Sequence, residues 1–400
     1  MANPKLRFKS DNGNDYPEWK ECILDDVFEE RNEAHLITED APQLSFTIEQ
    51  GVIYPEDKKT NKRDFLMKDK SSKKFLLTEC DDIIYNPANL KFGAIHRNKL
   101  CRGVVSPIYA IFKTDQNPAF MEYVVRNPRF IKRSLKYLEG TVIKLMTLKP
   151  RDFVKMAVSI PCMEEQQRIA DFLSNVDSLI TICEQEVSKL QELKKGCLQK
   201  MFPRNGSLLP EIRFPGFTDA WEQRKFGDVG SVSMCKRIFK DETSDEGDIP
   251  FYKIGTFGGV PDAYISRELF EEYKSKFSYP DEGDILLSAS GTIGRIVEYD
   301  GEEAYFQDSN IVWLKHDKSI SNKFLKVLYP TVKWDGIEGS TIQRLYNDNF
   351  LKTRFMMPSL PEQEKLGDYF GQLDNLITLH QRECEKYKDL KKGLLQQMFV

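Results

Sequence analysis

Three short motifs contain residue types that could carry out chemistry. Asn127-Pro128-Arg129-Phe130 approaches the N-P-P-[FY] active-site motif of adenine methyltransferases, but an arginine replaces the second proline. No glycine-rich cofactor loop precedes it in a strand–helix context, so we interpret it as a loop inside a basic helical region. Gly255-Thr256-Phe257-Gly258-Gly259 lacks the lysine of a phosphate-binding loop and is also interpreted as a loop.

The third motif is a loose match to the P-D…E-x-K pattern of metal-dependent nucleases, with Pro261-Asp262 followed by Glu272-Tyr273-Lys274. Cleavage would require these carboxylates to converge from adjacent strands. The stretch from Glu268 to Lys276 instead has the pattern of an exposed helix, and the four histidines lie far apart in the sequence. We therefore predict that this chain has no catalytic residues and no metal site.

Basic residues concentrate in one block. Residues 58–158 carry 22 Lys and Arg and 9 Asp and Glu, a net charge of +13, although the whole chain has a net charge of −4. Because polyanion binding depends on the local field, the acidic total is a weak objection to nucleic-acid binding. The predicted contacts are Lys58, Lys59, Lys62, Arg63, Lys91, Arg97, Asn98, Lys99 and Arg102. A third basic group, on a predicted helix, comprises Arg126, Arg129, Lys132, Arg133 and Lys136.

A second block, residues 203–357, carries 20 basic and 25 acidic residues, a net charge of −5. Arginine, serine, threonine and glutamine are side chains suited to base edges and phosphates. The predicted contacts in this block are Lys236, Arg237, Lys240, Ser288, Ser290, Thr292, Arg295, Gln343 and Arg344. We expect this block to rely more on polar base contacts and shape than on charge. For each residue taken singly, a solvated loop position is the alternative interpretation.

Both blocks have the pattern of mixed α/β structure. Predicted strands cover residues 82–85, 103–113, 283–288, 295–299 and 310–315, and predicted helices cover 119–138 and 322–329. A chain of 400 residues, 40% hydrophobic and 30% charged, is typical of a globular protein with more than one domain.

Membrane and secreted classes are not expected. No apolar run approaches the roughly 20 residues that span a bilayer, and the polar start MANPKLRFKSDNGND does not resemble a signal peptide. Eight cysteines without a C-x-x-C pair predict reduced thiols rather than a disulfide framework. These features favour a cytoplasmic protein.

The chain repeats itself at an offset of 197 residues. Between residues 160–202 and 357–399, 18 of 43 positions are identical. The strongest matches are Asp177 with Asp374, 179–181 with 376–378, and 194–196 with 391–393. The motif P-x-[LI]-R-F also occurs twice, at 4–8 and 210–214, each followed by a tryptophan. Internal similarity of this kind indicates two copies of one unit, each a variable block followed by a 40-residue tail.

Both tails are predicted to be long helices. Ile169, Val176, Cys183, Leu190 and Cys197 recur every seven residues, and Phe172, Leu179, Glu186 and Leu193 follow three residues later; the second tail has the same pattern. This is the a/d spacing of a coiled coil, and two matched copies favour an antiparallel pair within one chain. We predict that Cys183, Glu186, His380 and Glu383 set the register of this pair.

Two blocks that alternate with tails ending LKKGCLQKMF and LKKGLLQQMF resemble the DNA specificity (S) subunit of type I restriction-modification systems. The resemblance rests on the duplicated tails, on the P-x-[LI]-R-F motif, and on the pairs Glu165-Gln166 and Glu362-Gln363 that follow Ile160-Pro161 and Met357-Pro358. The resemblance implies an α+β fold with two target recognition domains joined by two antiparallel helices, and an N-terminus near the end of the last helix.

The resemblance also implies a function. Each recognition domain would read one half of a bipartite, asymmetric site on double-stranded DNA, and the helices would set the spacing and dock two modification subunits. Those partners would methylate adenine with S-adenosylmethionine, and restriction subunits would add ATP- and Mg-dependent translocation and cleavage, so no cofactor is expected in this chain. The implied boundaries are 1–158 and 203–357 for the recognition domains and 159–202 and 358–400 for the spacer helices. The alternative is a coiled-coil scaffold with two protein-binding domains.

Overall fold

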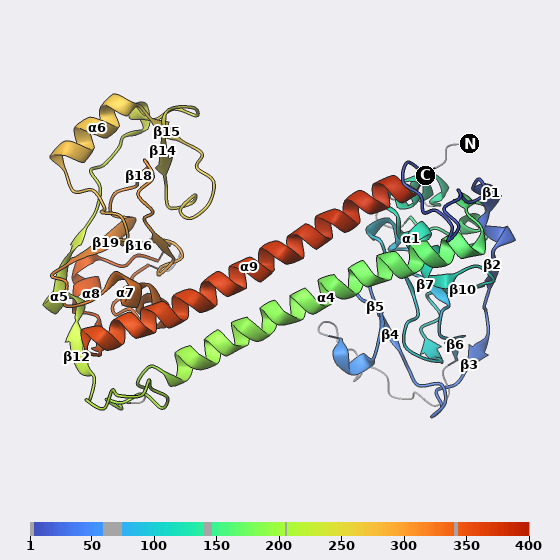
Figure 1. Ribbon diagram of the computed structural model, residues 1–400, viewed down its shortest axis with the longest axis horizontal. Coiled ribbons are helices and arrows are strands. Elements are labelled where there is room, and N and C mark those ends of the chain that lie inside the picture. Colours follow the sequence, from blue (N-terminus) through green and yellow to red (C-terminus); the bar gives the residue numbers. More distant parts are fainter. Residues whose placement is uncertain (1–3, 59–73, 140–145, 205, 340–342, 400) are drawn as a thin grey trace. The chain divides into compact units, whose positions relative to one another are not determined.

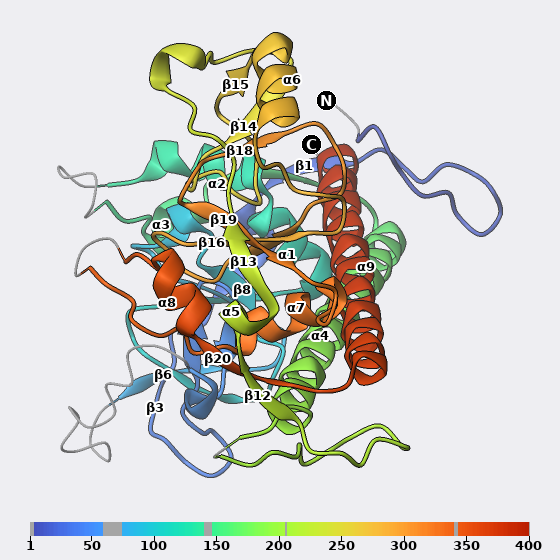
Figure 2. The same cartoon turned by 90° about the vertical axis from the view of Figure 1, so that its left-hand side faces the viewer.

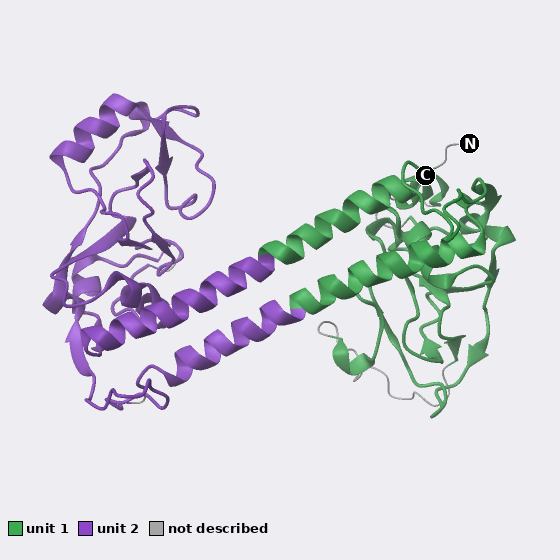
Figure 3. Cartoon of the chain, viewed as in Figure 1, with its two compact units in different colours: residues 1–184, 382–400 green, residues 185–381 purple. Residues whose placement is uncertain are grey.

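The computed structural model describes residues 4–58, 74–139, 146–204, 206–339 and 343–399 (Figure 1). The chain forms two compact units: unit 1 comprises residues 1–184 and 382–400, and unit 2 comprises residues 185–381 (Figure 3). The two long helices α4 (Met163–Lys200) and α9 (Leu360–Met398) each contribute residues to both units. The predicted α+β class and the two long helices are confirmed.

Unit 1 is built from short strands around a four-stranded sheet. Its strands are β1 (Lys20–Ile23), β2 (Phe28–Glu30), β3 (Ala34–His35), β4 (Ser45–Thr47), β5 (Gly51–Ile53), β6 (Phe75–Thr78), β7 (Ile83–Tyr85), β8 (Ile95–Arg97), β9 (Gly103–Val105), β10 (Ala110–Thr114) and β11 (Ala157–Ile160). Its shorter helices are α1 (Pro118–Arg126), α2 (Pro128–Ser134) and α3 (Pro150–Phe153). The central sheet has the order β2-β10-β7-β8, flanked by the sheets β3-β6-β9, β4-β5 and β1-β11.

Unit 2 has a corresponding arrangement. Its strands are β12 (Glu222–Lys225), β13 (Gly230–Ser233), β14 (Ile249–Tyr252), β15 (Tyr264–Ile265), β16 (Ile285–Ser288), β17 (Ile296–Glu298), β18 (Tyr305–Phe306), β19 (Ile311–His316) and β20 (Arg354–Met357). Its shorter helices are α5 (Phe226–Val229), α6 (Arg267–Lys276), α7 (Asn322–Leu328) and α8 (Asn347–Lys352). A sheet of order β15-β14-β18 lies beside α6 (Figures 1 and 2).

The central sheets of the two units share their strand order and register. Unit 2 has the order β13-β19-β16-β17, which matches β2-β10-β7-β8 strand for strand. In unit 1, Ile83 of β7 is paired with Arg97 of β8, and in unit 2, Ile285 of β16 is paired with Glu298 of β17. Positions on one sheet can therefore be compared directly with positions on the other.

Two predicted elements differ from the structure. The predicted strand 103–113 is two strands, β9 and β10, separated by a turn in which Tyr109 N–H bonds the Ser106 carbonyl. The predicted helix 119–138 is interrupted at Asn127, where α1 ends and α2 begins. Pro128 cannot donate a backbone hydrogen bond, and the Asn127 side chain caps the new helix by accepting from Arg129 N–H at 2.9 Å.

Within each unit, the segments of α4 and α9 run antiparallel. In unit 1, Asp177 pairs with Lys391 at 2.5 Å and Glu184 with Lys388 at 2.6 Å. In unit 2, Lys194 pairs with Asp374 at 2.5 Å. The offset of 197 relates Asp177 to Asp374 and Lys194 to Lys391, so these two ion pairs are equivalent. Some of the residues that are identical in the two tails therefore form the same ion pair in both units.

The predicted inner face of the helices was half wrong. Ile169, Val176 and Cys183 are buried as predicted. The residues three positions later, including Leu179, are exposed, and the buried partner is found four positions later, as at Leu173. A buried face whose residues alternate at steps of four and three fits an α-helix as well as the predicted face with steps of three and four. Only the packing of the helix shows which face is buried.

The P-x-[LI]-R-F motif holds the end of a long helix in each unit. In unit 1, Leu6 N–H donates to the Gln397 carbonyl near the end of α9, which places the N-terminal segment there as expected. In unit 2, Ile212 N–H donates to the Lys200 carbonyl at the end of α4. The aromatic residues that follow these helix ends enter the cores: Phe399 packs on Trp19, and Phe202 packs on Trp221.

Among the described residues, no helix combines the length and apolarity needed to cross a bilayer. None of the eight cysteines, all of which are described residues, is part of a disulfide.

Candidate nucleic-acid interface

A buried carboxylate organises the cationic edge of unit 1. Glu122, on α1, is only 2% exposed. Its carboxylate lies 3.0 Å from Lys99 Nζ, 3.4 Å from Arg126 Nη1 and 3.6 Å from Arg97 Nε. Arg97 ends the edge strand β8, so strand and helix together bring three cations to one place. The predicted contacts Arg97 and Lys99 are thus brought together, with Arg126 of the third basic group.

The charges around Glu122 keep it ionised. Burial alone would raise the pKa of this carboxyl, but Lys99, Arg126 and His96 hold the pKa below its usual value. One carboxylate faces three permanent cations, of which Arg97 also pairs with exposed Asp81 at 2.5 Å. The cluster therefore keeps a net positive charge, and Lys99 and Arg126 remain about half exposed.

Sequence reasoning missed Glu122, although a signal was present. It is the one charged residue in the apolar run Pro118–Val125. A lone carboxylate in such a run is buried with its helix face and requires cationic partners, because an unpaired buried charge is costly.

One predicted contact in unit 1, Asn98, has a structural role instead, whereas Arg102 stays at the surface. Asn98 is fully buried; its side-chain amide donates to the Glu79 and Cys101 carbonyls and accepts from Leu100 N–H, so it cannot reach DNA. Arg102 is exposed but is paired with Glu79 at 3.1 Å.

The remaining predicted contacts of unit 1 are scattered. Lys91 lies over the Phe92 ring at 5.3 Å, and Lys58 is half-buried. Lys59, Lys62 and Arg63 fall outside the described residues. In the third basic group, Arg129 donates to the Phe399 carbonyl at 3.0 Å, so it fastens the end of α9.

In unit 2, the predicted polar residues gather around the turn between β16 and β17. Ser290 is bridged to Arg344 but is only 5% exposed, so its prediction as a DNA contact is corrected. Gly291 N–H donates to the Gln343 carbonyl. Thr292, Arg295, Gln343 and Arg344 are exposed there. Residues about 50 positions apart in the sequence thus form one polar surface.

Ser288 does not belong to that surface. It is 1% exposed, its hydroxyl donates to the Thr292 carbonyl at 2.6 Å, and it accepts from Arg295 N–H at 2.9 Å. Its prediction as a DNA contact is corrected: it shapes the turn.

The second predicted group of unit 2 lies at the other sheet. Lys236 stands over the Phe277 ring at 5.1 Å, and Arg237 is paired with Asp308 at 2.8 Å. Lys240 is exposed at the start of a short 3-10 turn. These three residues lie near one another in sequence, but within the described residues they share no contact partner.

One ion pair is inverted between the units. In unit 1, Arg97 on edge strand β8 faces Glu122 on α1; in unit 2, Glu298 on edge strand β17 faces Lys326 on α7 at 2.7 Å. The strand positions are equivalent by register. The same scaffold position therefore presents a cation in one unit and an anion in the other.

The residues of the methyltransferase-like and nuclease-like motifs make other contacts. Asn127 is buried and caps α2, with its amide directed at the Leu395 carbonyl. Glu272 lies on α6 and is paired with Lys276, while Asp262 is paired with Lys253 on a loop. These carboxylates do not converge from adjacent strands.

The predicted register residues are only partly inside the helix pair. Cys183 is buried, whereas Glu186 is about half exposed and lies 3.5 Å from His380 Nδ1 within unit 2. Glu383 is exposed and accepts from the Tyr387 hydroxyl at 3.3 Å. The two glutamates are thus not buried polar residues of the seam.

Buried His96 makes unit 1 sensitive to acid. Burial lowers its pKa from 6.5 to about 4, and Arg126 contributes. The unfolded chain binds a proton here below about pH 6.5, but the folded unit does so only near pH 4, so stability is lost as the pH falls through this window. The loss attributable to His96 is about 3 kcal/mol. Urea unfolding of His96→Gln should show a shallower pH dependence between pH 7 and 4.5 than the unaltered chain, because the substitution removes this titrating group. Identical slopes for the two proteins would refute the assignment to His96.

Comparison with known proteins identifies the family. A family model described as the type I restriction modification DNA specificity domain matches residues 113–193 and 218–387, more than half of the chain. A putative type I restriction enzyme specificity subunit from Haemophilus influenzae is 55% identical over 178 residues, 42% of this chain and 46% of that protein. The chain thus spans about half the length of that relative. The putative MjaX specificity subunit of Methanocaldococcus jannaschii is 21% identical over 301 residues, 71% of this chain and 67% of that protein.

Solved structures show the same fold. The crystal structure of a type I restriction-modification S subunit from M. genitalium covers 100% of this chain and 99% of its own, with a TM-score of 0.62 and 14% identity. A structure concerned with assembly and conformational transition of a type I system covers 96% and 98%, with a TM-score of 0.51 and 16% identity. Because the family model matches more than half of the chain, the chain belongs to the family of type I restriction-modification DNA specificity subunits.

Proposed function

We propose that this chain is the non-catalytic, sequence-reading subunit of a type I restriction-modification complex, and that each unit reads one half of a bipartite DNA site. The inverted pair carries this proposal: equivalent strands present Arg97 in unit 1 and Glu298 in unit 2. Two scaffolds of the same topology with different side chains at matching positions suit two unlike half-sites. The recognised site is therefore asymmetric.

The two units use different contacts. The Glu122 cluster of unit 1 supplies fixed cations, which bind phosphates and give a salt-dependent affinity. The turn of unit 2 supplies Thr292, Gln343 and Arg344, which suit base edges. Phosphate contacts position the protein and base contacts specify the sequence.

The long helices would serve as the spacer. At about 1.5 Å per residue, α4 extends roughly 57 Å, enough to separate half-sites by a helical turn of DNA, about 34 Å. The helices also expose matched apolar side chains: Leu179, Ile182 and Leu390 in unit 1, and Leu376, Leu379 and Leu193 in unit 2. Two equivalent apolar surfaces suit two copies of one partner, the modification subunit.

The chemistry would belong to the partners. Modification subunits would supply adenine methylation with S-adenosylmethionine, and restriction subunits would supply ATP- and Mg-dependent cleavage, in the cytoplasm. In this chain, Asn127 of the methyltransferase-like motif caps α2, and Glu272 of the nuclease-like motif is paired with Lys276.

The test is DNA binding by this chain together with its modification subunit. We expect protection of one bipartite sequence, with affinity that falls steeply as salt rises. Lys99→Gln should reduce the slope of log affinity against log salt by about one for all sequences. Arg344→Ala should relax one base position at a cost of about 1–3 kcal/mol.

The control is Lys155→Gln, an exposed unit 1 lysine paired with Asp152 away from the Glu122 cluster. It should leave slope and specificity unchanged. Equal affinity for all sequences together with a flat salt response would favour a protein scaffold.

A further inference from the structure

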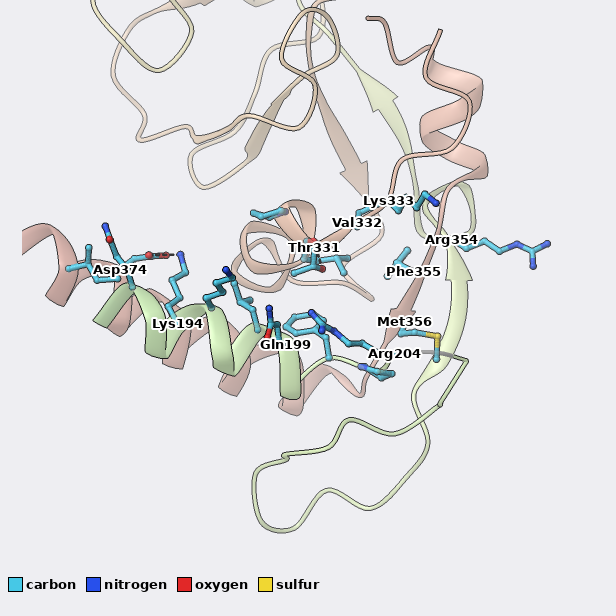
Figure 4. A pocket seen from close by; sticks show the side chains of 18 residues that line it. Lys194, Gln199, Arg204, Thr331, Val332, Lys333, Arg354, Phe355, Met356 and Asp374 are labelled. Atoms are coloured by element: carbon cyan, nitrogen blue, oxygen red, sulfur yellow. Dashed lines mark hydrogen bonds and ion pairs between the residues drawn. The ribbon is translucent and has the colours of Figure 1, made fainter. Parts of the chain in front are cut away.

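Unit 2 contains an open cavity of about 740 Å³ at the end of α4 (Figure 4). Its walls come from the last turns of α4, the 3-10 turn Tyr329–Thr331 with the residues after it, and β20. The floor is apolar and includes Leu198, Phe202, Leu328 and Phe355. The DNA-reading proposal uses none of these residues.

The rim of this cavity is cationic. Five Lys and Arg residues line it, against one carboxylate, Asp374, which is already paired with Lys194. Arg354 points away from the other side chains (Figure 4). Lys195, Arg204 and Lys333 are exposed, and across the described ranges none of them has an ion-pair partner.

Helix stabilisation does not explain this charge. The helix dipole acts on cations within the last turn of α4, where Lys200 is the basic residue, and Lys195 lies before that turn. Lys333 belongs to another segment, beyond the 3-10 turn, and gains nothing from this effect. Three unpaired cations around an apolar floor thus form a surface complementary to an acidic ligand with an apolar anchor.

The equivalent place in unit 1 is closed. The space lined there by Val158 and Phe399, the counterparts of Phe355 and Phe202, measures about 20 Å³. Helix α2 contributes Phe130 and Arg133 to the lining of this space, and Arg129 of the same helix donates to the Phe399 carbonyl. Among the residues that the structure describes, the cavity therefore differs between the two copies of the repeat.

We propose that this cavity binds an acidic peptide segment of a protein partner, with a bulky apolar side chain inserted between Asp or Glu residues, once per chain. A single site distinguishes this contact from the two equivalent surfaces proposed for modification subunits. A DNA phosphate is disfavoured because it would leave the apolar floor uncovered, whereas a peptide anchor buries it.

The experiment uses the full chain, with its modification subunit, and fluorescein-labelled synthetic peptides. One peptide carries Glu and Asp on both sides of Leu-Phe; its matched version carries Gln and Asn. Fluorescence anisotropy should show saturable 1:1 binding of the acidic peptide only. Lys195→Glu and Lys333→Glu should each weaken it about tenfold or more, since each removes a charge-assisted contact. Lys392→Glu, the equivalent of Lys195 in unit 1, should have no effect.

Several results would overturn the proposal: no saturable binding, equal binding of the Gln/Asn peptide, a 2:1 stoichiometry, or equal effects of Lys195→Glu and Lys392→Glu. A labelled DNA duplex whose affinity falls with Lys195→Glu, while the acidic peptide fails to bind, would reassign the cavity to phosphate. Sequence-specific DNA protection, measured on the same samples, tests the DNA-reading function separately. Intact protection without peptide binding refutes only the cavity proposal.

Discussion

Glu165→Ala should destabilise unit 1 by about 3–5 kcal/mol, the usual cost of breaking a buried ion pair. Glu165 is fully buried and accepts two hydrogen bonds from Arg7, at 2.6 and 3.0 Å. Without it, the Arg7 guanidinium stays largely buried and keeps only its bonds to the Tyr16 and Pro17 carbonyls. The measurement is the free energy of unfolding from urea titrations.

Glu164→Ala is the matched control, since Glu164 lies next to it on α4 but is exposed; it should change stability by less than about 0.5 kcal/mol. Unit 2 repeats the test: Glu362→Ala removes a fully buried partner of Arg213, which donates twice at 2.7 Å. The two sites share no partner, so the losses should add. A loss no larger than that of the control would show that the pair does not anchor the P-x-[LI]-R-F motif.

Charged substitutions on the exposed apolar side chains of the helices should remove modification subunits one at a time. Replacing Leu179, Ile182 and Leu390 by Glu should leave one bound copy, and replacing Leu376, Leu379 and Leu193 should remove the other copy instead. Each apolar side chain buried in such an interface contributes about 1.5–3 kcal/mol, so three changes should weaken one site at least a thousandfold, about 4 kcal/mol. Native mass spectrometry of the assembled complex reports the number of copies.

Leu208→Glu is the control, because Leu208 is equally exposed but lies outside the helices. It should leave two copies bound. Two copies in the triple variants, or loss of both copies from either one alone, would exclude two independent equivalent surfaces.

Much of the architecture could be predicted because it is duplicated in the sequence. The offset of 197 identified two units and two long helices, and the structure explains part of the identity, since Asp177–Lys391 and Asp374–Lys194 are equivalent contacts. The second face of the helices could not be predicted. Residues such as Leu179 and Leu173 are equally apolar, and only packing leaves the first exposed and the second buried.

The candidate site was predicted less well, because residue type does not reveal what a side chain already contacts. Asn98 and Ser288 are suited to DNA by type, yet both are buried and satisfied by backbone groups. Conversely, Glu122 does not suit a polyanion site by type, but it holds three cations at one edge.

Sequence by itself determined the duplication, the positions of the long helices and the cationic excess of residues 58–158. Periodicity and net charge depend only on the order and types of the residues. Tertiary structure alone decided which charges are neutralised, which apolar side chains stay exposed, and why the described residues leave a cavity of about 740 Å³ at the end of α4 but only about 20 Å³ beside Val158 and Phe399. Burial and ion pairing depend on neighbours far away in the chain, and those neighbours differ between two units that share one strand order.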